Sequence, residues 1–187
     1  MQPYKKLFTY WFSVIIYDLT VEFCERWIKS WKLKEQMTGA GRSGKQNIVE
    51  ASDDMGVSLK LAIKMTGTAK GSIEELTGDF EDFLRQRKML KWGKNDPRVL
   101  EMRARSAKLV RNLSDLSILG KEPETEKLLR TGELPADPEE AANFLLTLCH
   151  QDSLLLHRQV ESLKIKHQKE GGFTEELYRK RKEYRGY

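Results

Sequence analysis

Histidine and cysteine, the side chains that most often bind metals or act as nucleophiles, are few in this chain and poorly spaced for either task. The 187 residues include three histidines, His150, His157 and His167, and two cysteines, Cys24 and Cys149. His150 and His157 are two helical turns apart, about 10 Å along a helix axis, which is too far for one ion without a third element. No Ser–His–Asp or Cys–His arrangement follows from this spacing. We therefore expect no metal, no cofactor and no catalytic residue within one chain.

Basic side chains are concentrated in one stretch, where they could bind an anionic partner. Residues 85–111 carry ten Lys and Arg side chains against only Asp96 and Glu101, whereas the whole chain has a net charge of +5. Such a tract can contact the phosphates of RNA or DNA without reading bases. An ordinary solvated basic helix face is the alternative interpretation. The predicted nucleic-acid-binding residues are Arg85, Arg87, Lys88, Lys91, Lys94, Arg98, Arg103, Arg105, Lys108 and Arg111.

The elements that must position these side chains are predicted to be helices throughout. Apolar residues recur every three or four positions along most of the chain, and the 13 glycines show no regular turn spacing. Asp96-Pro97 and Asp137-Pro138 each place an N-cap before a proline at the first helical position. Gly171-Gly172 marks the end of the last long predicted helix. The predicted helices cover residues 5–32, 34–52, 56–90, 97–116 and 138–170, with one short turn at 124–131.

These helices predict an all-α fold with two parts. We expect residues 1–118 to form an up-down four-helix bundle, and residues 119–187 to form a helical suffix domain. The stretch 120–138 reads as the linker between them, since it holds glycines and prolines and only one short turn.

The first predicted helix carries two apolar stripes, which is more than the core of a four-helix monomer needs. One stripe runs from Phe8 to Phe23 at helical spacing. The second stripe allows two interpretations: a central, well-buried helix, or a helix with one side against a neighbouring subunit. Under the second interpretation the oligomer interface contains Trp11, Val14, Val21 and Cys24.

Small residues cluster at 39–44 in the second predicted helix and at 66–72 in the third. Each glycine costs a helix about 1 kcal/mol relative to alanine, and a close helix crossing can offset that cost. We therefore expect the two clusters to cross. The polar residues beside them are interpreted as a hydrogen-bond network that sets helix register, with a contact surface as the alternative. The expected helix-packing motif is Arg42, Ser43, Asn47 and Glu50.

The N-terminal apolar stretch is a poor candidate for a membrane span. Residues 7–21 include Thr9, Ser13, Asp18 and Thr20, and no small-residue cleavage site follows. Two distant cysteines without metal-ligand spacing are typical of a reducing compartment. We expect no membrane contact and a cytoplasmic location.

The residues from 36 to 76 resemble a known family. The stretch QMTGAGRSGKQNIVEA contains Gln36, Arg42-Ser43 and Asn47-Ile48-Val49-Glu50, and a later stretch runs from Ala69 through Ser72 to Glu75-Leu76. These motifs resemble those of the four-helix-bundle proteins of the 23S rRNA intervening-sequence family. The chain departs from that pattern at Ala51, where the family usually has glycine. The resemblance covers about residues 5–90, and the remainder looks like the suffix found in a subset of members.

The resemblance implies an assembly more than an activity. Family members look like pentameric barrels of four-helix bundles, and some relatives are accessory proteins of the reverse transcriptases of diversity-generating retroelements. It implies no catalytic residues. The leading hypothesis is a non-enzymatic, oligomeric protein associated with RNA or DNA that serves a reverse transcriptase. The alternatives are a protein-interaction scaffold with no nucleic-acid role and, more weakly, an enzyme site between subunits.

Overall fold

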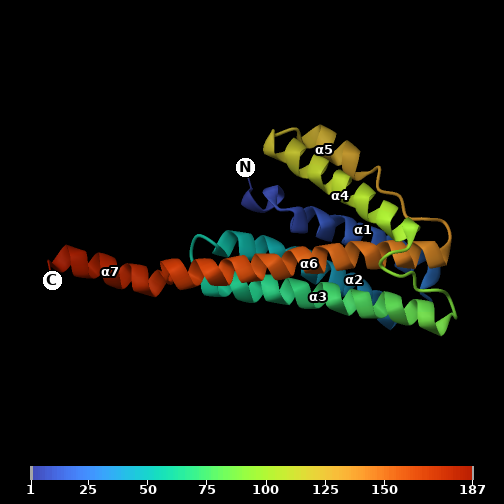
Figure 1. The fold of residues 1–187 in the computed structure, drawn as a ribbon, viewed down its shortest axis with the longest axis horizontal. Coiled ribbons are helices and arrows are strands. Elements are labelled where there is room, and N and C mark those ends of the chain that lie inside the picture. The colour runs from blue at the N-terminus through green and yellow to red at the C-terminus, as the bar shows by residue number, and fades with distance from the viewer. Residues whose placement is uncertain (1, 187) are drawn as a thin grey trace.

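The computed structural model describes residues 2–186, and the side chains of all of these except 173–175. Every regular element in this range is a helix, which confirms the all-α prediction (Figure 1). A 3₁₀ helix, η1, comes first and seven α-helices follow. Their bounds are η1 Pro3–Lys6, α1 Phe8–Trp27, α2 Trp31–Asp54, α3 Leu59–Gln86, α4 Pro97–Ile118, α5 Glu122–Leu129, α6 Pro138–Glu170 and α7 Phe173–Arg185.

Local capping sets where several of these helices begin and end. Asp96 accepts a hydrogen bond from the Arg98 backbone N–H, and Asp137 accepts one from that of Glu140, so α4 and α6 begin at the prolines that the sequence marked. The helix α6 ends before Gly171, which has a φ of 76°. The first predicted helix was too long at both ends, because Leu7 and Ile28 adopt extended conformations.

Four long helices share the core. The helix α2 packs along α3, α3 packs along α6, and α1 contacts both α2 and α6. One continuous cluster joins Phe23 of α1, Phe80 of α3 and Leu148 of α6. The core therefore draws residues from both sides of residue 118, where the predicted domain division falls. The reason is that α6 carries a longer apolar face than α4.

The shorter helices cover one side of this core. The helix α4 packs against α1, η1 and α6, and α5 packs against α4 (Figure 1). Val110 and Leu113 of α4 belong to the central cluster. This cover removes the basis for the interface predicted on α1.

Three of the four predicted interface residues are buried within the single chain. Trp11 is buried, and its indole nitrogen donates a 2.8 Å hydrogen bond to the Lys5 carbonyl oxygen. Val14 and Cys24 are also buried, and Val21 is half-buried. The helix α1 is thus the central, well-buried helix of the first interpretation. The sequence could not reveal this, because much of the cover comes from α4 and α6, which lie far from α1 in the sequence.

The small residues of α2 allow close approach, as predicted. Ser72 of α3 donates a hydrogen bond to Ser43 of α2 at an Oγ–Oγ distance of 3.1 Å. A Cβ added at Gly44 would lie 3.0 Å from Cδ1 of Ile73, and one at Gly41 would lie 3.3 Å from the Tyr17 ring. A larger side chain at either position would push neighbouring helices apart.

No helix within residues 2–186 combines the length and the apolar character that crossing a lipid bilayer requires.

Candidate nucleic-acid interface

The ten predicted basic residues are all exposed, and they fall into two groups with different surroundings. We call the first group the anchored half: Arg85, Arg87, Lys91 and Arg98, near the end of α3 and the start of α4. We call the second group the open half: Arg103, Arg105, Lys108 and Arg111, all on α4. The two remaining residues, Lys88 and Lys94, lie in the connection between α3 and α4.

Cations of the anchored half are held by groups of the chain itself. Arg85 lies 2.6 Å from a carboxylate oxygen of Asp82, and Lys91 lies 3.1 Å from one of Glu81. Arg87 donates a 3.2 Å hydrogen bond to a backbone carbonyl oxygen in α1, and its guanidinium lies 3.8 Å from a ring centroid of α3. These side chains are therefore partly neutralised before any ligand arrives.

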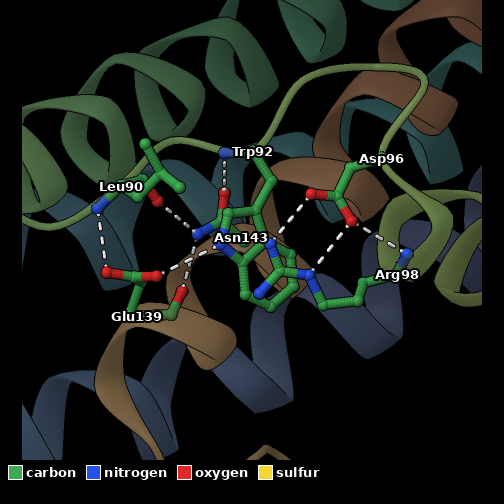
Figure 2. A network of polar contacts seen from close by, with 6 residues as sticks. All are labelled: Leu90, Trp92, Asp96, Arg98, Glu139 and Asn143. Carbon is green, nitrogen blue, oxygen red and sulfur yellow. Dashed lines mark hydrogen bonds and ion pairs between the residues drawn. The ribbon is translucent and has the colours of Figure 1, made fainter.

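Arg98 is held most closely, beside a tryptophan that anchors the connection to α6. Figure 2 shows Arg98 paired with Asp96, at 2.8 Å for the shorter ion-pair distance. The same guanidinium lies 3.5 Å from the ring centroid of Trp92, which is a cation–π contact. The Trp92 indole nitrogen donates a 3.2 Å hydrogen bond to Glu139. Hydrogen bonds from Arg98 lower the pKa of Asp96, and Asp96 in turn raises the pKa of Arg98.

Asn143 of α6 fixes the backbone of this connection. Its side-chain oxygen accepts a 2.8 Å hydrogen bond from the Trp92 N–H, and its amide nitrogen donates a 2.9 Å bond to the Leu90 carbonyl oxygen (Figure 2). Glu139 accepts a further bond from the Leu90 N–H at 2.8 Å. Asn143 is only 2 % exposed. The prediction from sequence missed Asn143 and Glu139, because nothing in a helical stretch marks them as partners of a distant connection.

Cations of the open half have no such partners. None of these four side chains forms an ion pair or a side-chain hydrogen bond among the described residues. Arg105, Lys108 and Arg111 recur every three residues, and they lie opposite the buried side of α4 that Val99 and Val110 mark. The structure thus places four positive charges that have no partner among the described residues on the exposed surface of one helix.

The backbone beneath the open half is tied to α6 by Gln151. Its side-chain nitrogen donates a 3.1 Å hydrogen bond to the Arg103 carbonyl oxygen, and its oxygen accepts a 2.7 Å bond from Ser106. These contacts use the main chain of Arg103 and leave its guanidinium free. Gln151 therefore positions the cationic helix without neutralising it.

A cavity of about 210 Å³ opens beside the open half, between α1, α4 and α6. Ile15 and Phe144 contribute apolar side chains to its lining, and Arg105 and Lys108 of α4 line it as well. Glu133 lines the same cavity, so the charges around it are mixed. The cations of the open half therefore lie on the outer face of α4, which also carries the exposed Glu101 and Asp115, and only Arg105 and Lys108 reach this cavity.

The predicted helix-packing motif lies away from these cations, on α2. The Asn47 side-chain nitrogen donates bonds to the Ser43 carbonyl oxygen at 2.8 Å and to Ser43 Oγ at 3.1 Å. Ser43 then links α2 to α3 as described above. Arg42 and Glu50 are exposed and form no hydrogen bond or ion pair within the described residues. Only the two inner residues of the motif contribute to a hydrogen-bond network.

Asp152 of α6 is the most unusual titratable group in the core. It is 0 % exposed, and neither carboxyl oxygen has a hydrogen-bond partner among the described residues. Burial raises the pKa of Asp152 well above its ordinary value, and burial likewise raises the pKa of Cys149. The signal was present in the sequence, since Asp152 falls on the apolar stripe that contains Cys149 and Leu156.

Among the described residues, no group of three or more His, Cys, Asp or Glu side chains is placed to hold a metal ion. Comparisons with protein-family models, with curated proteins and with solved structures found no match to this chain. The resemblance to the intervening-sequence family therefore stays a prediction.

Proposed function

We propose that this chain is a non-enzymatic accessory protein that binds RNA or DNA through the open half of the basic tract. The observation that carries the proposal is the set of four exposed cations on α4 that have no acidic partner among the described residues. Unpaired cations on a regular helix can contact successive phosphates with little loss of conformational entropy, because the helix backbone is already fixed.

The proposal has a quantitative consequence for salt dependence. Four phosphate contacts release about four condensed counterions, so affinity falls about 50- to 150-fold between 50 and 200 mM salt. Cations of the anchored half would add less, since each already has a partner that competes with phosphate.

The experiment compares two fourfold variants of the full chain by fluorescence anisotropy with labelled RNA and DNA strands. The variant Arg103→Ala/Arg105→Ala/Lys108→Ala/Arg111→Ala should lose at least tenfold in affinity and most of the salt dependence. The control Lys32→Ala/Lys60→Ala/Lys64→Ala/Lys127→Ala makes the same change in net charge at exposed sites elsewhere. Equal losses in the two variants, or no binding by the wild type at low salt, would contradict the proposal.

We further propose a finer architecture. The sequence predicted an up-down four-helix bundle within residues 1–118; because α6 shares the core, we propose that α1, α2, α3 and α6 form this bundle instead. The subunits would assemble into a ring, preferably of five as the family resemblance implies, that serves a reverse transcriptase. Since Trp11, Val14 and Cys24 are buried within the chain, the subunit contacts would use other surfaces. Mass measurement in solution tests the assembly, and a monomer at micromolar concentration would argue against the ring.

A scaffold without a nucleic-acid role is the second candidate. Exposed Leu154 and Ile165 on α6, each 51 % exposed, favour it because they offer apolar contacts for a protein partner. Affinity capture with and without nuclease separates the two functions. Partners that survive nuclease treatment support the scaffold, whereas partners lost with the nucleic acid support the leading proposal.

A further inference from the structure

The C-terminal helix α7 extends away from the rest of the molecule. Figure 1 shows it beyond the ends of α2 and α3, as a continuation of α6. The last buried residue of α6 is Leu163, and the chain turns at Gly171 before α7 begins. Residues 177–186 are all exposed. A lone helix of 13 residues is marginal in water, so contacts with a partner would stabilise α7.

The two sides of α7 differ in charge: one carries cations and a tyrosine, and the other mixes acidic and basic side chains. Tyr178, Arg181, Lys182 and Arg185 follow the spacing i, i+3, i+4, i+7 and therefore share one face, which we call the α7 face. Glu176 and Glu183, seven residues apart, lie on the opposite side. On that opposite side Glu176 and Glu183 alternate with Lys180, as in a helix stabilised by its own ion pairs, whereas the α7 face carries no acidic side chain among residues 176–186.

The cations of the α7 face have no partner within the described residues. Among the described side chains of α7, an ion pair joins Lys180 to Glu176 at 2.6 Å, off this face. Arg181 and Arg185 are four residues apart, and like charges at that spacing destabilise an isolated helix. An anionic ligand would relieve this repulsion and order the helix at the same time.

Tyr178 indicates which anionic ligand fits. It is 71 % exposed and lies beside three cations, in the combination of aromatic ring and positive charge by which proteins bind unpaired nucleic-acid strands. A single strand can stack a base on the ring while its phosphates meet the cations. A duplex keeps its bases stacked inside and cannot do so. A lipid surface fits less well, since a membrane-bound helix needs a broad apolar face.

We propose that the α7 face is a second contact site that takes a single-stranded segment of RNA or DNA, with a base stacked on Tyr178 and phosphates on Arg181, Lys182 and Arg185. This inference rests on the proposed function. It adds the class of nucleic acid, because the open half of α4 contacts phosphates in either form, whereas the α7 face favours unpaired strands.

The test measures binding of the full chain to a labelled oligothymidine strand and to a duplex of equal length. Tyr178→Ala should weaken single-strand binding at least fivefold, which is the lower end of the effect of losing one stacked base, and should leave duplex binding nearly unchanged. Tyr178→Phe should retain wild-type affinity. Tyr184→Ala is the matched control, since Tyr184 is 94 % exposed but lies off the α7 face.

The outcomes separate this inference from the proposed function. If α7 variants leave both affinities unchanged while the α4 variant loses binding, the second site is wrong and the proposed function stands. If Arg181→Gln/Lys182→Gln/Arg185→Gln weakens strand and duplex equally and Tyr178→Ala changes neither, the preference for single strands is wrong. If the wild type binds anionic phosphatidylserine vesicles and no nucleic acid, both proposals are wrong.

Discussion

The anchored and open halves of the basic tract are equally cationic in the sequence and differ in what the fold places around them. In the anchored half, Arg85, Lys91 and Arg98 each have a carboxylate within 3.1 Å. In the open half, Arg105 and Lys108 have none among the described residues. Charge density along a chain therefore does not measure the charge available to a ligand, because internal partners use part of it.

The difference follows from the local backbone. The connection between α3 and α4 is irregular, so its N–H and C=O groups need partners outside the element, which Asn143 and Glu139 supply. Asp96 and Trp92 of this connection also hold Arg98, whereas Arg85 and Lys91 pair with acidic residues of α3. On α4 the four cations of the open half have no ion-pair partner among the described residues.

The largest expected effect is the loss of the anchor beneath the connection. Asn143→Ala leaves the Trp92 N–H and the Leu90 carbonyl without their partner and should cost about 2–3 kcal/mol of stability. The matched change beneath the open half, Gln151→Ala, should cost about 1 kcal/mol, because Gln151 is less buried and water can replace it. Urea denaturation measures both. Equal losses of stability in the two variants would show that the anchored half is held no more tightly than the open half.

The second effect concerns Asp152, which neighbours Gln151 and lacks the partners that Asn143 has. Because burial raises its pKa in the folded state, the wild type loses stability as pH rises above the ordinary carboxyl value of 3.8. Asp152→Asn removes this loss and should stabilise the protein by about 2 kcal/mol at pH 8, with little change at pH 3.5. Thermal unfolding across this pH range checks it. If the stability gained by Asp152→Asn did not grow with pH, the Asp152 carboxylate would have hydrogen-bond partners in the folded state, against this prediction.

The third effect is the difference in binding between the two halves. The variant Arg85→Ala/Arg87→Ala/Lys91→Ala/Arg98→Ala should weaken nucleic-acid binding less than threefold. The open-half variant should weaken it at least tenfold, which corresponds to about 1.4 kcal/mol. Anisotropy titrations at one salt concentration compare them directly. A larger loss from the anchored-half variant would reverse the comparison and move the proposed interface to the α3–α4 connection.

The smallest effect is the pH response at the start of α4. Hydrogen bonds from Arg98 lower the pKa of Asp96 in the folded state, so its contribution to stability is present above pH 3.8 and is lost as pH falls through the lowered value. Asp96→Asn keeps a capping side chain and removes the charge. This variant should have a slightly lower free energy of unfolding than the wild type at pH 7 and the same value at pH 2.5. Unfolding followed by circular dichroism measures both. Equal losses at both pH values would assign the effect to the cap and not to the ion pair.

The sequence was sufficient for the fold class and for several boundaries, because these depend on neighbouring residues. Helical periodicity and the Asp-Pro pairs located the starts of α4 and α6, and Gly171 located the end of α6. The crossing of the small-residue clusters of α2 and α3 was also predicted and is seen at Ser43 and Ser72 and at Gly44, whereas Gly67 and Gly71 of α3 make no close contact.

The candidate site shows where such local information ends. The sequence alone identified all ten basic residues and did not divide them: Asp82 and Asp96 stand within three residues of Arg85 and Arg98, whereas Glu81 reaches Lys91 only in the folded chain. It also could not decide whether the second stripe of α1 was free, because α4 and α6, which cover α1, come from distant parts of the chain. Periodicity determines which face of a helix is apolar. Only tertiary packing determines what covers that face and which charges remain free, because both depend on contacts between residues far apart in sequence.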